Sequence, residues 1–100
     1  LIECIIVLVV DRSILSAGYA EFVSPSLSGA ETAVNIPANQ LYGGVDYQLI
    51  ILTFDRWISD PNVFYAVSDF TPSGLMQGIS TAPDHDFDFI GLSYSTFRTY

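Results

Sequence analysis

The sequence predicts an all-β domain, folded as an antiparallel β-sandwich around one core. Short runs rich in isoleucine, valine and aromatic residues recur along the 100 residues, and turns rich in Gly, Pro, Asn and Asp separate them. No segment has the apolar period of a convincing amphipathic helix. Half of the residues are hydrophobic and 14% are charged, so the chain has enough apolar surface to fold.

Three strand candidates come before Pro37. Residues 1–10 are rich in β-branched side chains and are predicted to form a buried central strand. Residues 19–23 resume a strand-like composition after a short turn. Residues 31–36 are expected to form a further strand, which Pro37 ends.

Residues 45–54 are predicted to form the main strand of the domain. Alternation places two sets of side chains on opposite faces of this strand, Tyr47, Leu49, Ile51 and Thr53 on one and Gln48, Ile50, Leu52 and Phe54 on the other. Both sets are largely apolar. The strand is therefore expected to be central and covered on each side, or to present its outer face to a partner.

Two strand candidates complete the pattern. Residues 63–68 follow an Asp-Pro-Asn turn and are expected to pair with residues 45–54 as a hairpin. Residues 71–74 are interpreted as another break, and residues 87–97 as the last strand. The aromatic side chains near the end of the chain favour strand addition to another sheet as much as packing in the core.

Residues 41–53 resemble the fibronectin type III pattern, in which a leucine, a glycine turn and a tyrosine open a core strand. Leu41 matches the leucine, Gly44 the glycine and Tyr47 the corner tyrosine, whose hydroxyl ties down the turn in such modules. The resemblance implies an immunoglobulin-like sandwich, found outside the cell, that serves adhesion, recognition or spacing.

The resemblance covers residues 1–72 and leaves the first two strands of such a module without a place. Residues 19–22 and 42–44 are also similar to the membrane-proximal ectodomains of receptor tyrosine phosphatases. We predict a sandwich core over residues 1–72 and a C-terminal extension over residues 73–100 within the same domain. Because missing strands expose a sheet edge, the sandwich is expected to be incomplete or strand-exchanged. Residues 87–97 fold back over the edge or insert into the next copy, or a separate chain supplies the missing strands.

The charge of the chain limits its partners. The net charge is −8, and the three arginines stand singly in a chain without lysine. Nucleic acid needs clustered cations, so we exclude it as a partner. The apolar run at residues 5–10 is too short to cross a bilayer, and no membrane insertion of this segment is expected. An acidic surface favours an extracellular or cell-surface location, with another protein or a second copy as partner.

No group of residues has the spacing of a catalytic site. Cys4 lies among isoleucines and valines and is expected to be a buried thiol. The single histidine, His85, is far from it in sequence, and no serine lies in a nucleophile elbow. We therefore do not expect an enzyme.

Three aspartates at alternate positions, Asp84, Asp86 and Asp88, are the candidate metal ligands. Calcium takes several oxygen ligands, and these three carboxylates supply half a shell. An EF-hand is excluded, because Phe89 and Ser95 stand where its glycine and glutamate are needed. The alternative is a solvated face of a strand, with no cofactor bound.

Arg56 and Trp57 are the candidate partner-binding residues. Both residue types are enriched in interaction hot spots, and the two lie in an expected loop. Alternatively, Trp57 folds back to cap the core. The sequence thus favours a non-catalytic extracellular module for adhesion, recognition or spacing. The alternative function is a structural subunit of a fibre or surface assembly joined by strand exchange.

Overall fold

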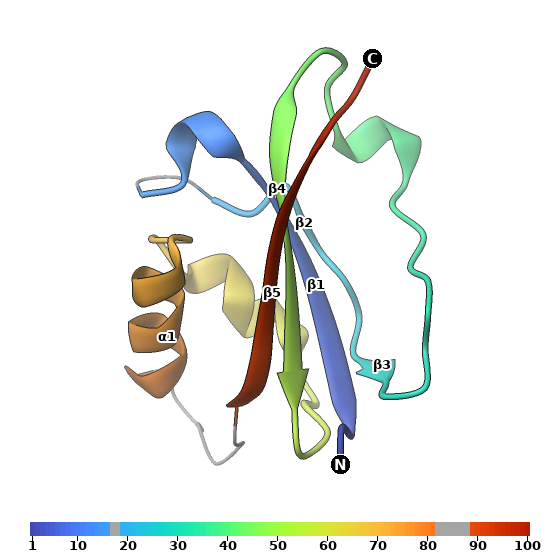
Figure 1. The fold of residues 1–100 in the computed structure, drawn as a ribbon, viewed down its shortest axis with the longest axis vertical. Coiled ribbons are helices and arrows are strands. Elements are labelled where there is room, and N and C mark those ends of the chain that lie inside the picture. Colours follow the sequence, from blue (N-terminus) through green and yellow to red (C-terminus); the bar gives the residue numbers. More distant parts are fainter. Residues whose placement is uncertain (17–18, 82–88) are drawn as a thin grey trace.

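The computed structural model of the chain describes residues 1–16, 19–81 and 89–100. In this part of the chain five strands form one antiparallel sheet in the order β2-β1-β4-β5, and β3 also pairs with β1 (Figure 1). The strands are β1 Cys4–Asp11, β2 Phe22–Val23, β3 Leu27–Ser28, β4 Asp46–Phe54 and β5 Phe89–Arg98. The helices are the α-helix α1 Pro72–Thr81 and the 3-10 helices η1 Arg12–Ile14, η2 Ala38–Gln40 and η3 Pro61–Ala66. The predicted antiparallel β-sheet is confirmed, and α1 is an addition to the all-β fold that the sequence predicts.

Strands β1 and β4 form the centre of the sheet, and their register follows from alternation. Ile6 pairs with Leu52, and Leu8 pairs with Ile50. These four side chains are fully buried on one face of the sheet, as the predicted faces of residues 45–54 require.

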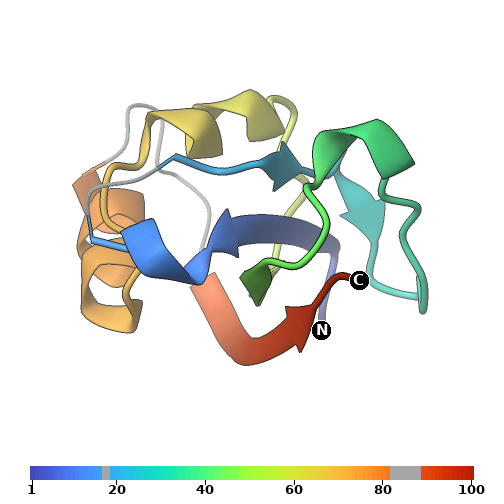
Figure 2. The same ribbon diagram turned by 90° about the horizontal axis from the view of Figure 1, so that it is seen from above.

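Helices α1 and η3 cover this face (Figure 2). Leu75 from α1 and Phe64 from η3 are buried in the same cluster, and the Phe64 ring lies 5.9 Å from that of Phe54. Cys4 is a free thiol buried in this cluster. The larger core of the molecule therefore lies between the sheet and its helices.

The opposite face of the sheet is covered by an irregular segment, residues 29–45. Val34 and Ile36 from this segment pack against a small cluster that contains Val9, Phe22 and Tyr47. The cover is partial, because side chains further along this face stay half-buried, namely Ile5, Leu49 and Ile51. This face is therefore the less protected side of the sheet.

Several predicted strands are wrong or shorter than expected. Residues 31–36 lie over the sheet without joining it, and only residues 22–23 of the predicted strand at 19–23 are paired. Residues 63–68 are not a hairpin mate, since most of them belong to η3. Pro61 starts η3, and the Asp60 carboxylate accepts a hydrogen bond from Asn62 N–H, which caps the helix.

The predicted break at residues 71–74 is instead the start of α1. Thr71 is the cap, because its Oγ1 accepts a hydrogen bond from Gly74 N–H at 3.2 Å. Pro72 takes the first helical position, where a missing N–H has no cost. Asp69 holds Thr71 through two hydrogen bonds, and these lower the pKa of the Asp69 carboxyl.

Candidate functional site

Strand β5 ends the sheet, and its outer edge is free within the described residues. Thr99 N–H donates to Val45 O at 3.1 Å, and the register continues from this pair through β5. Bonded pairs recur at every second residue of an antiparallel ladder. The backbone N–H and C=O groups of Leu92, Tyr94 and Thr96 therefore point away from β4.

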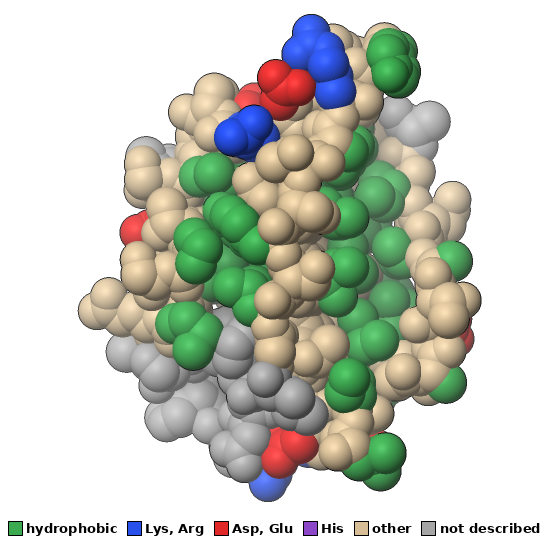
Figure 3. Space-filling view, in the orientation of Figure 1, with side chains coloured by type: hydrophobic (Ala, Val, Ile, Leu, Met, Phe, Trp, Pro, Cys, Tyr) green, Lys and Arg blue, Asp and Glu red, His purple; other side chains and the backbone are tan. Residues whose placement is uncertain are grey.

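One side of β5 carries very small side chains, at Gly91, Ser93 and Ser95. Next to Ser93 and Ser95 in the ladder are Ile51 and Leu49 of β4, which stay half-buried. We call these five residues the apolar strip. Figure 3, in the orientation of Figure 1, shows hydrophobic side chains on both sides of the tan band that runs along the position of β5.

The opposite side of β5 faces the helices. Leu92 and Tyr94 are partly buried against the larger core, and the Tyr94 hydroxyl donates to Phe70 O at 2.8 Å. Burial, and then the charge of Asp69, raise the pKa of Tyr94, while the nearby Arg12 lowers it. The hydrogen bond to Phe70 O therefore holds the Tyr94 side chain in place beside the free edge.

Over residues 89–97, the edge lacks two of the usual protections against pairing with another chain. Natural proteins guard exposed edges with charged side chains or prolines. Residues 89–97 contain neither, and β5 is ten residues long. A long unguarded edge is a liability unless it has a partner.

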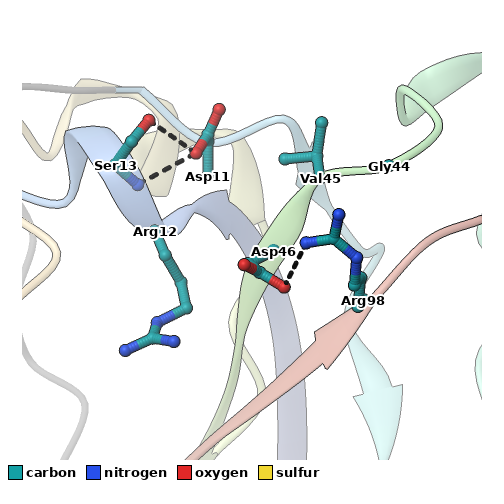
Figure 4. A pocket seen from close by; sticks show the side chains of 7 residues that line it. All are labelled: Asp11, Arg12, Ser13, Gly44, Val45, Asp46 and Arg98. Carbon is teal, nitrogen blue, oxygen red and sulfur yellow. Dashed lines mark hydrogen bonds and ion pairs between the residues drawn. The ribbon is translucent and has the colours of Figure 1, made fainter.

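A second candidate is a polar hollow of about 460 Å³ at the end of the sheet where β1 ends and β4 begins (Figure 4). Its walls come from the ends of three strands and from η1, with the residues Asp11, Arg12, Ser13, Gly44, Val45, Asp46 and Arg98. Two carboxylates and two guanidinium groups make the lining neutral in total.

Most charges of the hollow already serve the fold. Asp11 accepts hydrogen bonds from both the backbone N–H and the hydroxyl of Ser13, at 2.9 and 2.8 Å, and so caps η1. Arg98 pairs with Asp46 at 3.1 Å. Arg12 has no ion pair within the described residues. These interactions organise the end of the sheet.

The three predicted corner residues lie together at the start of β4. Tyr47 is 1% exposed, and its hydroxyl accepts a hydrogen bond from Tyr42 N–H at 2.8 Å. Leu41 packs in the same cluster as Tyr47. Gly44 has φ +72°, a backbone conformation that residues other than glycine rarely adopt. The tyrosine therefore fastens the turn that leads into its own strand.

The predicted partner-binding residues, Arg56 and Trp57, lie in the loop between β4 and η3, and both are exposed. The Trp57 side chain is 56% exposed, and its neighbour Ile58 enters the core instead. Arg56 lies 3.8 Å from the carboxylate of Asp55. Neither residue is part of the ladder between β4 and β5.

The predicted metal ligands Asp84, Asp86 and Asp88 lie outside the described residues. Among the residues that are described, no three acidic, histidine or cysteine side chains form a group that could hold a metal ion. The described helices are also too short or too polar to cross a membrane.

Comparison of the chain with protein-family models, with curated proteins and with solved structures finds no match. The main candidate site is therefore the free edge of β5 within the described residues, and the sequence alone did not identify this strand as an edge. The available clue was an uncharged, proline-free strand at residues 89–97.

Proposed function

We propose that the chain is a non-catalytic recognition module that binds an extended segment of a partner protein as an added strand along β5. The observation that carries this proposal is the edge of β5, which is free within the described part of the chain and has no charge or proline over residues 89–97. In strand addition, main-chain hydrogen bonds give affinity and alternate side chains give specificity. The outward groups of Leu92, Tyr94 and Thr96 supply the main-chain bonds.

The side chains of an added strand meet a different surface on each side of β5. Those on one side contact the apolar strip, where Ser93 and Ser95 leave room for large neighbours. Those on the other side contact Tyr94 and Leu92. Apolar contacts at every second residue of the bound segment thus give the binding its specificity.

We also propose that the fold is related to a fibronectin type III-like sandwich. The order β2-β1-β4-β5 is the order of the sheet that contains strands C and F in immunoglobulin-like domains. The bond from Tyr42 N–H to the Tyr47 hydroxyl has the character of a tyrosine corner. Residues 29–45 cross the face on which a second sheet packs in such domains. This relation, with the acidic surface, supports an extracellular or cell-surface location.

Self-assembly by pairing of two β5 edges is the alternative that we disfavour. In an antiparallel pair of copies, the small residues Gly91, Ser93 and Ser95 of both chains share one face of the joint sheet. The apolar strip then gains a large neighbour only where Phe97 of the second copy reaches it, because Phe97 lies on the same side of β5 as Ser93 and Ser95. A segment with larger side chains covers it better.

Selection of peptides from a phage-displayed library of random dodecapeptides tests the proposed function. Wild type is compared with Thr96→Pro, which removes an outward N–H, a change that edge strands tolerate. Thr96→Val keeps the N–H and is the matched control. We expect peptides that bind wild type and Thr96→Val and lose at least about tenfold in affinity for Thr96→Pro, as loss of a well-made bond implies.

Hydrogen exchange by NMR gives an independent readout. Adding a selected peptide is expected to slow exchange at the amides of Leu92, Tyr94 and Thr96. The amides of Ser93 and Ser95 already bond to β4 and change little. Selection of no peptides, or of peptides that bind Thr96→Pro as well as wild type, contradicts the proposal.

A further inference from the structure

We infer, on the basis of the proposed function, that the segment bound by β5 is cationic and carries large apolar side chains at alternate positions. Its apolar residues lie opposite Ser93 and Ser95, and lysines or arginines flank them. Two independent observations lead to this chemistry, the size of the side chains on β5 and the charge of the chain.

The size argument concerns the apolar strip. Gly91, Ser93 and Ser95 cannot cover Ile51 and Leu49, which stay half-buried in the isolated chain. An aliphatic or aromatic side chain on the neighbouring strand reaches across serine to these residues, because diagonal neighbours on a sheet are within reach of large side chains. Alternate positions of the bound segment are therefore apolar.

The charge argument concerns the whole chain. Eleven acidic residues and three arginines give a net charge of −8, and there is no lysine. Two of the three arginines lie beside carboxylates, Arg98 beside Asp46 and Arg56 beside Asp55. The field around the molecule is therefore negative, and it attracts a cationic segment and repels an anionic one.

The same field argues against a second copy as the occupant. Two chains of charge −8 repel each other, and the one cation of β5, Arg98, is already paired with Asp46. A cationic segment with large apolar side chains at alternate positions supplies both the charge and the side-chain size that the edge lacks.

The composition of the peptides selected from the dodecapeptide library tests this inference. Among peptides whose binding requires the free edge, we expect a net positive charge and large apolar residues two positions apart. For a synthetic copy of one such peptide, raising NaCl from 50 to 500 mM is expected to weaken binding about tenfold, because salt screens charges over this range. A copy with its basic residues changed to glutamate is expected not to bind.

The outcomes separate the inference from the proposed function. Edge-dependent peptides that are neutral or acidic, or whose binding is independent of salt, overturn the inference and leave strand addition in place. Edge-dependent peptides without the apolar alternation overturn the size argument. If no peptide depends on the edge, the proposed function fails and this inference with it. Dimers in analytical ultracentrifugation that Thr96→Pro abolishes would assign the edge to a second copy.

Discussion

Tyr47 connects two parts of the molecule at the scale of single residues. Its ring is stacked against that of Phe97 in β5, with the ring centroids 5.7 Å apart. Its hydroxyl accepts a hydrogen bond from the N–H of Tyr42, which lies in the turn before β4. Removing the hydroxyl leaves that N–H without its protein partner. We expect Tyr47→Phe to lower the free energy of unfolding by about 1 kcal/mol in urea denaturation.

The control for this prediction is Tyr42→Phe. The Tyr42 side chain is 72% exposed, and the substitution keeps the backbone N–H that bonds to Tyr47. We expect it to change stability by less than about 0.5 kcal/mol. Equal effects of the two substitutions would show that the bond between Tyr42 and Tyr47 does not stabilise the turn.

Glu21 makes stability depend on pH. Burial, and then the charge of Asp11, raise the pKa of Glu21 above its ordinary value. The folded state then binds this proton more tightly than the unfolded state, so this residue's contribution to stability is present at low pH. It is lost as the pH rises through the raised pKa.

Glu21→Gln is therefore expected to stabilise the protein at pH 7, by about 0.5 kcal/mol because the group is only partly buried. The gain is expected to vanish near about pH 3, where the carboxyl is protonated in both states. Urea denaturation at the two pH values measures the difference. Glu31→Gln, at an exposed position, removes the same charge, and an equal gain from it would point to net charge rather than burial.

At the scale of elements, the sequence predicted the long strands but did not predict the helices. Residues 45–54 alternate two apolar faces, and β-branching stiffens residues 1–10, so both strands could be predicted from local preference. The sequence predicts a break at residues 71–74, where α1 begins, because threonine and proline occur both at the starts of helices and in turns. Residues 31–36 have a strand's composition, but whether they join a ladder depends on contacts with Val9 and Phe22, distant in sequence.

The cap of α1 makes the helix testable as a unit. Thr71→Ala removes the acceptor of the Gly74 N–H and the donor to Asp69. We expect a loss of about 1 kcal/mol in unfolding free energy, measured by circular dichroism during urea denaturation. Ser73→Ala, at an exposed position of the first turn, is the control. If both variants lose the same stability, the cap does not hold the helix.

At the scale of the whole molecule, the sheet has one face sealed by helices and one face only partly covered. The sequence could predict that residues 45–54 have two apolar faces, and it could predict a last strand at residues 87–97. It could not show that this strand is an edge, because strand order is decided by pairings between distant segments. The sequence therefore predicted the strand that forms the candidate site, but it did not predict that this strand lies at the edge of the sheet.

If the partly covered face is kept open for a partner, covering it should stabilise the isolated protein and impair binding. Ser93→Val places a β-branched side chain beside Ile51 on the apolar strip. We expect it to raise the free energy of unfolding by about 0.5 kcal/mol, as such cross-strand pairs do. We also expect it to lower the affinity for edge-dependent peptides about tenfold, because their apolar side chains lose this contact.

The matched control is Thr96→Val, which adds the same side chain to β5 at a position outside the strip. It is expected to retain peptide binding. Fluorescence titration of a labelled peptide and urea denaturation of the same samples measure the two effects together. A Ser93→Val protein that is more stable and binds as tightly as wild type would show that the partner does not contact the strip. A variant that loses both stability and binding would show that Ser93 serves the fold, because an open surface gains stability when it is covered.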